Sequence, residues 1–224
     1  MKKDILYTFR RCPYAIRARW ALLMTNKSVI WREVDLRNKP SELIKSSKKA
    51  TVPLLITVEG QVLRESYDIM LWAINSSKAH KQFLKKGSNS YKESIHKIFL
   101  NDSHFKFHLD RYKYGGKGYS VKKEIHRLIA TDILIKWNNN LSFDSCKRTY
   151  WLVNGQESIA DWSLWPFVRQ FRLVDPELFD SNINLKNLRK WLSYFLTHDL
   201  FQQLMQKSDS WQPEDSQKYF PIIS

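Results

Sequence analysis

The N-terminal part of the chain alternates between short apolar runs and segments with helical periodicity. Residues 5–9 form an apolar and aromatic run, which is typical of a β-strand. Pro13 then opens a segment in which Ile16, Trp20 and Leu23 recur at helical spacing, and proline is favoured at the first position of a helix. The pattern therefore predicts a strand followed directly by a helix.

A second strand, a short helix and a hairpin are expected next. Residues 29–36 alternate like a strand, and residues 40–47 have the pattern of a short helix. Two β-prone runs flank the turn at 59–60, and Ser66 is placed to cap a helix that reaches roughly to Ile74. The resulting order βαβαββα is the thioredoxin-like arrangement, an α/β fold.

The character of the chain changes after this helix. Residues 76–90 are polar and basic and carry the Gly, Ser and Asn cluster of a linker. We therefore expect a first domain over residues 1–77, a linker over 78–90 and an all-helical domain over 91–224.

The expected second domain shows helical periodicity throughout. Its apolar residues recur at helical spacing in four segments, which we expect to be helices: residues 95–112, 121–137, 159–173 and 185–206. Gly115–Gly118 breaks the chain between the first two of these segments. Pro166 is expected to kink the third.

Composition indicates a globular protein and constrains its location. The 224 residues are 43% hydrophobic, which suffices for one large core or two small ones. No segment approaches the roughly 18 uncharged apolar residues of a membrane span, and no apolar run of a secretion signal follows the basic N-terminus. The only cysteines are Cys12 and Cys146, which fits a reducing compartment. We expect a cytoplasmic protein with no membrane segment.

The chain is strongly basic. It has 37 Lys and Arg against 22 Asp and Glu, a formal net charge of +15. Such a balance often accompanies binding to nucleic acids or anionic surfaces. Here the basic residues are spread over apparent polar helix faces and loops, without a nucleic-acid recognition motif among them. We therefore expect a solvated basic surface that attracts small anions, rather than a nucleic-acid site.

Cys12 stands between the first expected strand and the first expected helix. Backbone N–H groups and the helix macrodipole stabilise an anion at a helix N-terminus, and Arg10 and Arg11 add positive charge. The pKa of the Cys12 thiol is therefore expected to lie below that of a free cysteine, which would provide a nucleophilic thiolate at neutral pH. The alternative is an inert capping residue, because an apolar buried setting would raise the pKa.

The motifs around Cys12 resemble those of a known family. The segment Cys-Pro-Tyr-Ala at 12–15 resembles the active-site turn of glutaredoxins and glutathione transferases, with alanine where a dithiol glutaredoxin has its second cysteine. Residues 48–55 resemble the loop leading into the family's cis-proline, here Pro53. Residues 64–66 resemble its Glu-Ser motif, and residues 36–40 its omega-class lysine loop. Over nearly its whole length, the chain resembles the cysteine-type glutathione transferases, such as the omega and beta classes, and their architecture.

The resemblance implies a glutathione site built from the first domain. Glu65 would pair with the ammonium of the γ-glutamyl group, and Ser66 would offer its hydroxyl and backbone N–H to the γ-glutamyl carboxylate. Val52, directly before Pro53, would present extended backbone to the cysteinyl part of glutathione, as an added strand would.

Two further residues complete the implied site. Lys39 would meet the glycyl carboxylate, and Tyr14 would pack beside the sulfur. The alternative for Lys39 is an ordinary surface lysine, and for Glu65 and Ser66 a plain capping motif. Ala50 departs from the family pattern, because glycine commonly stands at that position.

Other polar clusters have simpler interpretations. Ser158 and Asp161 have the spacing of a helix capping box, although the residue before them, Glu157, is not the apolar residue of a hydrophobic staple. His104 and His108 can share a helix face, but no third ligand accompanies them, so we expect no metal site.

The missing second cysteine implies a monothiol route. The Cys12 thiolate would attack a glutathione mixed disulfide, and free glutathione would regenerate the enzyme. The expected function is a glutathione-dependent thiol transferase or reductase, with glutathione as co-substrate and a small disulfide or electrophile as second substrate. The alternatives are conjugation of glutathione to small electrophiles and a noncatalytic binding module for a protein or RNA partner. The resemblance also implies a homodimer.

Overall fold

The structure, a computed structural model, describes residues 3–115 and 120–222. Most of the expected break at Gly115–Gly118, together with the side chain of Val121, lies outside the described residues. The chain divides into two compact units, the first comprising Met1–Leu84 with Asp199–Ser224 and the second Lys85–His198.

Unit 1 confirms the thioredoxin-like order βαβαββα. Its elements are β1 (Ile5–Thr8), α1 (Pro13–Met24), β2 (Val29–Glu33), α2 (Ser41–Ser46), β3 (Leu54–Ile56), β4 (Val62–Leu63), α3 (Ser66–Asn75), the 3-10 helix η1 (Lys81–Leu84), α10 (Phe201–Leu204) and β7 (Lys218–Phe220). The strands form one sheet in the order β4-β3-β1-β2-β7. Strand β1 runs parallel to β2 and antiparallel to β3, so it is the central strand of the sheet.

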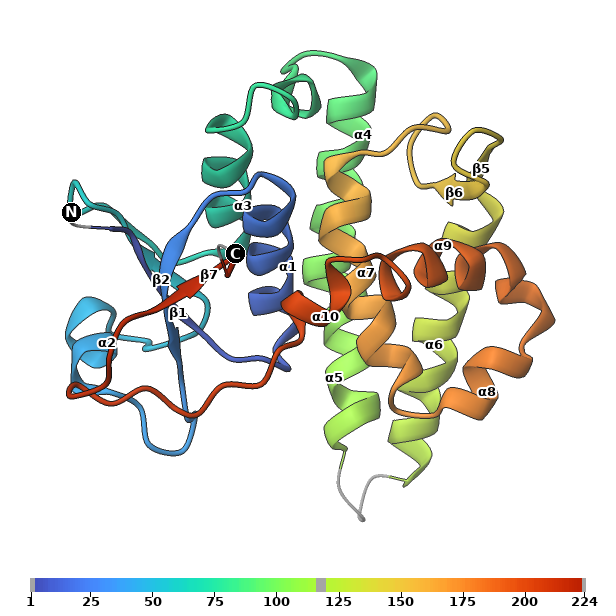
Figure 1. Cartoon of the computed structure of the whole chain (residues 1–224). Coiled ribbons are helices and arrows are strands. Elements are labelled where there is room, and N and C mark those ends of the chain that lie inside the picture. Colours follow the sequence, from blue (N-terminus) through green and yellow to red (C-terminus); the bar gives the residue numbers. More distant parts are fainter. Residues whose placement is uncertain (1–2, 116–119, 223–224) are drawn as a thin grey trace. The chain divides into compact units, whose positions relative to one another are not determined.

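Helices cover both faces of this sheet. Figure 1 shows α1 and α3 on one face and α2 on the other. Tyr7 packs with Leu43 of α2, whereas the preceding residue, Leu6, is fully buried and points to the opposite face, as alternation along a strand requires. This arrangement brings the end of β1, the start of α1 and the loop before β3 together where strand β1 ends.

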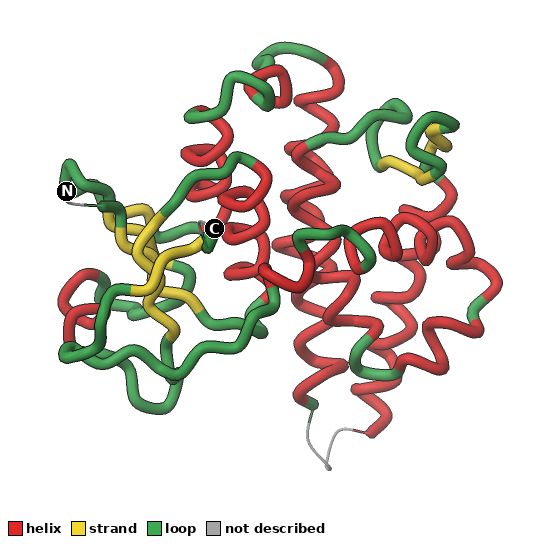
Figure 2. The backbone as a smooth tube through the Cα atoms, viewed as in Figure 1, coloured by secondary structure: helices red, strands yellow, loops and turns green. Residues whose placement is uncertain are grey.

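Unit 2 is mainly helical, as Figure 2 shows by colour. Its elements are α4 (Asn89–Leu100), the π-helical turn η2 (Asn101–Phe105), α5 (Lys106–Tyr114), α6 (Ser120–Asn139), β5 (Ser142–Asp144), β6 (Thr149–Trp151), α7 (Ile159–Arg172), α8 (Pro176–Ser181), η4 (Ile183–Leu185) and α9 (Lys186–Leu196). Large aromatic side chains fill its core, and Trp165 stacks on Phe195 with the ring centroids 5.4 Å apart. None of the helices among the described residues has the length and apolarity to cross a membrane.

The structure differs from our expectation in the C-terminal half. We expected residues 91–224 to form one all-helical domain, but the last 26 residues, Asp199–Ser224, belong to unit 1, where β7 pairs antiparallel with β2. The expected helix over 185–206 is interrupted, since α9 ends at Leu196 and α10 begins at Phe201. Unit 2 also contains the hairpin β5–β6. Strands of three residues are too short to show an alternating pattern, which is why the sequence did not indicate them.

The expected capping box is present at the start of α7. The buried carboxylate of Asp161 accepts hydrogen bonds from the Ser158 N–H (2.9 Å) and hydroxyl (2.6 Å). A polar contact replaces the hydrophobic staple, because Glu157 accepts a hydrogen bond from the indole N–H of Trp162 (2.7 Å), the residue to which a staple would reach. The box therefore fixes the entry of the chain into the central helix of unit 2.

Candidate functional site

Cys12 lies at the junction between β1 and α1. It is the N-cap residue of α1, with extended backbone angles (φ −74°, ψ 123°), and Pro13 occupies the first helical position. The Cys12 carbonyl accepts the first helical hydrogen bond from Ile16 N–H (2.9 Å). The side chain is half-buried, and neither Cys12 nor the exposed Cys146 is in a disulfide. The thiol therefore stands at the positive end of a twelve-residue helix dipole, as the sequence indicated.

The loop before β3 approaches this thiol. The Cys12 Sγ atom lies 3.8 Å from the carbonyl oxygen of Val52, within the limit for a weak hydrogen bond to sulfur. The bond between Val52 and Pro53 is cis, as expected for this loop. Two residues earlier, Ala50 has φ +43°, in the left-handed region that favours glycine. The residue that departs from the family pattern thus stands where the backbone itself favours glycine.

The turn that carries Cys12 is held by the backbone of Arg10. Its N–H donates to Glu33 Oε1 at the end of β2 (2.6 Å), and its carbonyl accepts from the guanidinium of Arg19 in α1 (2.7 Å). The Arg10 guanidinium itself reaches the Met205 carbonyl (3.4 Å). Strand β2, helix α1 and the C-terminal segment therefore all fix the residue two positions before Cys12.

Glu33 and Arg19 are both buried, with 6% and 0% of their surface exposed. Burial raises the pKa of Glu33, while the Arg10 N–H and the charge of Arg19 act in the opposite direction. The opposite charges of this pair offset part of the cost of burying each. Since their hydrogen bonds lead to Arg10, the buried pair supports the geometry of the turn.

Ser66 and Glu65 lie at the start of α3. The structure corrects the expected cap, because Glu65 is the N-cap residue and Ser66 is the first residue inside the helix. Glu65 is exposed, whereas Ser66 is 4% exposed. Its Oγ accepts a hydrogen bond from Arg17 Nη1 (3.3 Å), which joins α3 to α1. Ser66 therefore lies at a helix N-terminus, with a guanidinium beside it.

Arg17 is the residue of this site that we did not predict. It is fully buried in α1, and its guanidinium carbon also lies 5.5 Å from the ring centroid of Tyr14. It thus connects two expected site residues, Tyr14 and Ser66. A signal was available in the sequence, because Arg17 and Arg19 are the only charged residues between Pro13 and Met24. A charge in so apolar a helix indicates a buried partner.

Lys39 is not joined to this group. It is half-buried in the loop between β2 and α2, and within the described ranges it has no hydrogen bond or ion pair to Cys12, Val52, Glu65 or Ser66. The role expected of Lys39, binding the glycyl carboxylate, therefore depends on a bound glutathione that would reach from the other site residues to Lys39.

The histidines of unit 2 form a cluster of their own. The ring centroids of His104 and His108 lie 5.0 Å apart, and His108 Nδ1 lies 2.8 Å from His126 Nδ1. Burial, followed by the nearby charges of His104, His126 and Arg111, lowers the pKa of His108. Within residues 3–115 and 120–222, no three or more His, Cys, Asp or Glu side chains are arranged to hold a metal ion.

Comparison with protein families identifies two matching segments. Residues 6–79 match the N-terminal domain of glutathione S-transferases, and residues 129–193 match the C-terminal domain of the same proteins. The two segments together span more than half of the chain, and the first contains every residue of the candidate site. No curated protein matches the sequence significantly.

Solved structures show the same fold at low identity. A glutathione transferase Omega 3C from Trametes versicolor has a TM-score of 0.74 and 16% identity, with 95% of this chain and 87% of that chain covered. A possible glutathione S-transferase from Rhodopseudomonas palustris has a TM-score of 0.70 and 19% identity, with 92% and 100% covered. The transferase URE2P8 from Phanerochaete chrysosporium, solved with oxidized glutathione, has a TM-score of 0.71 and 15% identity, with 91% and 94% covered.

Proposed function

We propose, because the chain belongs to the glutathione S-transferase family, that it is a glutathione-dependent thiol transferase in which Cys12 is the nucleophile. The observation that carries this proposal is the placement of the Cys12 thiol at the N-terminus of α1, 3.8 Å from the Val52 carbonyl. A thiol in this position is close both to a positive helix end and to backbone that can pair with a peptide.

Glutathione would bind along the edge formed by the β3 loop and α3. In this proposal the Val52 backbone pairs with the cysteinyl part of glutathione and Pro53 shapes the loop, which places the glutathione sulfur near Cys12 Sγ. The start of α3 receives the γ-glutamyl group, where Ser66 binds its carboxylate and the exposed Glu65 binds its ammonium.

The remaining contacts lie at either end of the ligand. Tyr14, one residue into α1 from Pro13, packs beside the sulfur, and Lys39 pairs with the glycyl carboxylate. Lys39 is the weakest member of this set, since only bound glutathione would connect it to the others.

The reaction consists of two thiol–disulfide exchanges. The Cys12 thiolate attacks the glutathione sulfur of a mixed disulfide, forms a Cys12–glutathione disulfide and releases the substrate thiolate, which takes up a proton. The thiolate of a second glutathione then attacks the glutathione sulfur of this intermediate, which yields oxidised glutathione and restores the Cys12 thiolate. Ala15 stands where a second cysteine of a dithiol enzyme would be, so this route needs no second protein thiol.

The test compares wild-type protein with Cys12→Ser and a matched control, Cys146→Ser. Cys146 is exposed and lies in unit 2, so its loss removes a thiol without touching the site. Exchange with a small glutathione mixed disulfide should be lost in Cys12→Ser and kept in Cys146→Ser. Alkylation of Cys12 should show a midpoint below the value of about 8.5 of a free cysteine.

Equal exchange by wild-type protein and Cys12→Ser would contradict the proposal. In that case, activity in joining glutathione to a small electrophile would indicate the conjugation alternative. Glutathione binding without any turnover would indicate the noncatalytic binding module. The homodimer stays a prediction from the family resemblance, and the cytoplasmic location stays a prediction from composition. Sedimentation at several protein concentrations would test the homodimer.

A further inference from the structure

The turn that leads into Cys12 determines where its sulfur lies. The Cys12 N–H donates to the Phe9 carbonyl (3.1 Å), which closes a tight turn in which Arg10 is the first central residue. Because Cys12 is also the N-cap residue of α1, the orientation of this turn sets the position of the sulfur at the helix N-terminus. Residues that fix the turn therefore act on the thiol.

Both backbone groups of Arg10 are bound by buried charged side chains from outside the turn. Glu33 Oε1 at the end of β2 accepts from the Arg10 N–H (2.6 Å), and Arg19 Nη2 of α1 donates to the Arg10 carbonyl (2.7 Å). The turn's own hydrogen bond joins only its first and last residues, so these two bonds hold the peptide groups on either side of Arg10. Hydrogen bonds to ionised partners are about twice as strong as neutral ones.

The two side chains are themselves held by neighbouring strands. Glu33 Oε2 accepts from Trp31 Nε1 (3.2 Å), so both carboxylate oxygens have a donor. Trp31 packs edge-on against Phe220 of β7, with the ring centroids 5.7 Å apart, and the guanidinium carbon of Arg19 lies 6.0 Å from the centroid of the same Phe220 ring. Packing on one ring of β7 therefore supports both Arg19 and the donor to Glu33.

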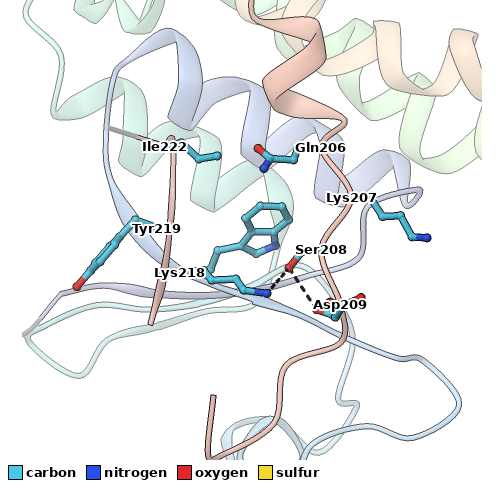
Figure 3. Close-up of a pocket in the computed structure, with 8 residues that line it drawn as sticks. Gln206, Lys207, Ser208, Asp209, Lys218, Tyr219 and Ile222 are labelled. Carbon is cyan, nitrogen blue, oxygen red and sulfur yellow. Dashed lines mark hydrogen bonds between the residues drawn. The ribbon is translucent and has the colours of Figure 1, made fainter. Parts of the chain in front are cut away.

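Residues of the C-terminal segment lie around Trp31. Trp31 lines a cavity of about 510 Å³ together with Gln206 and Ser208 of the segment after α10 and Lys218 of β7, three side chains that Figure 3 labels. Lys218 is the register partner of Trp31, and its Nζ lies 3.2 Å from Ser208 Oγ. Since only 4% of Trp31 is exposed, its indole N–H keeps a fixed direction towards Glu33.

We propose that Arg19 and Glu33 are a positioning pair for the thiol exchange assigned to Cys12, because they hold the turn in the orientation that keeps the sulfur at the N-terminus of α1. This inference rests on the proposed function for the reaction that the pair assists. The pair acts through the backbone of Arg10, whereas the proposed glutathione contacts come from Val52 and the start of α3. Loss of the pair should therefore change the reactivity of the thiol and leave glutathione binding unchanged.

The size of the effect follows from the charge at a helix end. The N-terminus of a helix can lower the pKa of a nearby thiol by about one pH unit, so a sulfur that moves out of this position should lose about that much. The thiolate fraction then falls about tenfold at pH values below the pKa. The thiolate that remains is about threefold more nucleophilic, because thiolate nucleophilicity increases with pKa. The rate of exchange at such pH values should therefore fall about threefold.

The main variant is Arg19→Met/Glu33→Leu, with Cys146→Ser in every protein so that Cys12 is the only thiol. It removes one positive and one negative charge, so the net charge near the thiol is unchanged. Apolar side chains of similar size commonly replace a buried pair of charges without loss of folding. The midpoint of Cys12 alkylation should rise by about one pH unit. At about pH 6, kcat should fall about threefold, with the KM for glutathione within about twofold of the parent protein.

Two single substitutions test the individual bonds. Glu33→Gln keeps an oxygen for the Arg10 N–H and should keep the alkylation midpoint near that of the parent protein. Arg19→Lys keeps the buried charge but presents a shorter side chain with a single ammonium, so the midpoint should rise, by less than in the double variant. Because Arg19→Lys leaves Glu33 opposite a cation, it also provides the test if a melting curve shows that the double variant does not fold.

The control is Asp4→Ala, which removes a different buried carboxylate of unit 1. Asp4 Oδ1 accepts from the Val58 N–H (3.0 Å), and Asp4 Oδ2 lies 3.5 Å from Lys27 Nζ. Asp4 precedes β1, whereas the turn follows β1, so the substitution removes a buried hydrogen bond without touching Arg10. The melting temperature should fall, and the alkylation midpoint should stay unchanged.

An unchanged alkylation midpoint in both Arg19→Met/Glu33→Leu and Arg19→Lys would overturn the positioning role. An equal rise in Asp4→Ala would also overturn it, since the effect would then come from lower stability alone. The alkylation series does not require catalysis. If Cys12→Ser keeps full exchange activity, that result contradicts the proposed function, whereas the midpoints still show whether the pair positions the thiol.

Discussion

At the scale of single residues, Arg17 has the clearest untested role. It is a fully buried guanidinium that donates to Ser66, so it fixes the hydroxyl at the start of α3. A charged donor in a low-dielectric setting strengthens that hydrogen bond and adds positive potential to a helix N-terminus. We therefore infer that Arg17 positions Ser66 for a carboxylate rather than contacting the reacting sulfur.

Replacing this residue should affect binding more than chemistry. In Arg17→Met, the KM for glutathione should rise by roughly tenfold, as expected for the loss of one charge-assisted contact, with a much smaller change in kcat. Steady-state exchange kinetics measure both constants, and Arg17→Lys should restore part of the affinity. A drop in kcat at constant KM would contradict this positioning role. A melting curve of each variant separates misfolding from lost binding.

The sequence indicated some of these residues and not others. Cys12 was recognisable because its position depends on local order alone, a strand followed by a helix that begins with proline. The local pattern marks Arg17 as a charge in an apolar helix, but it does not show that Ser66 is its partner. That pairing and the role of Glu33 depend on which elements become neighbours. The cap at Glu65 rather than Ser66 is a shift of one residue, within the usual uncertainty of helix ends.

At the scale of elements, α7 is anchored by one buried carboxylate. Besides the two groups of Ser158, Asp161 accepts hydrogen bonds from the Leu152 N–H (2.9 Å) and from Trp191 Nε1 (2.9 Å). It thereby links the segment after β6, the start of α7 and helix α9. Burial raises the pKa of Asp161 to about 6, although each of these four hydrogen bonds acts to lower it.

The raised pKa of Asp161 makes the stability of the folded protein depend on pH. The folded protein holds a proton on Asp161 more tightly than the unfolded chain does. The stabilisation of the folded state that comes from protonated Asp161 is therefore fully present below about pH 4 and is lost as the pH rises through about 6. The difference in unfolding free energy between wild-type protein and Asp161→Asn should therefore shrink by about 2–3 kcal/mol from about pH 4 to about pH 7. Denaturant unfolding at several pH values measures it. A difference that grows with pH would show that the hydrogen bonds, not burial, dominate.

The sequence predicts a helix or strand when a short stretch of residues is enough to specify it. The capping box and the order βαβαββα follow from short patterns in the sequence. Strand β7 does not, because three residues near the C-terminus become a strand only through pairing with β2. The same holds for the hairpin β5–β6, whose strands lie between two helices.

At the scale of the whole molecule, the C-terminal segment is part of the unit that carries Cys12. Trp211 N–H donates to the Glu33 carbonyl (2.8 Å), and its ring lies 3.8 Å from the Arg32 guanidinium and packs edge-on against Tyr7. With β7 on the edge of the sheet and Met205 bonded to Arg10, this segment supports the sheet and the Cys12 turn together.

Removing the Trp211 side chain should test this support. Trp211→Ala deletes the cation–π contact with Arg32 and the packing on Tyr7, and should lower the unfolding free energy by about 2 kcal/mol. Thermal or denaturant unfolding measures the change. The control is Trp211→Phe, which keeps an aromatic ring and should lose less. An unchanged melting temperature in Trp211→Ala would mean that the segment is bound without stabilising unit 1.

The proposed route requires Cys12 to form a disulfide with glutathione during turnover. Intact-protein and peptide mass spectrometry after brief treatment with a glutathione mixed disulfide measures this disulfide directly. We expect one glutathione per chain, located on Cys12, absent from Cys12→Ser, present in Cys146→Ser and released by free glutathione. An adduct on Cys146 alone, or turnover without any adduct on Cys12, would contradict it.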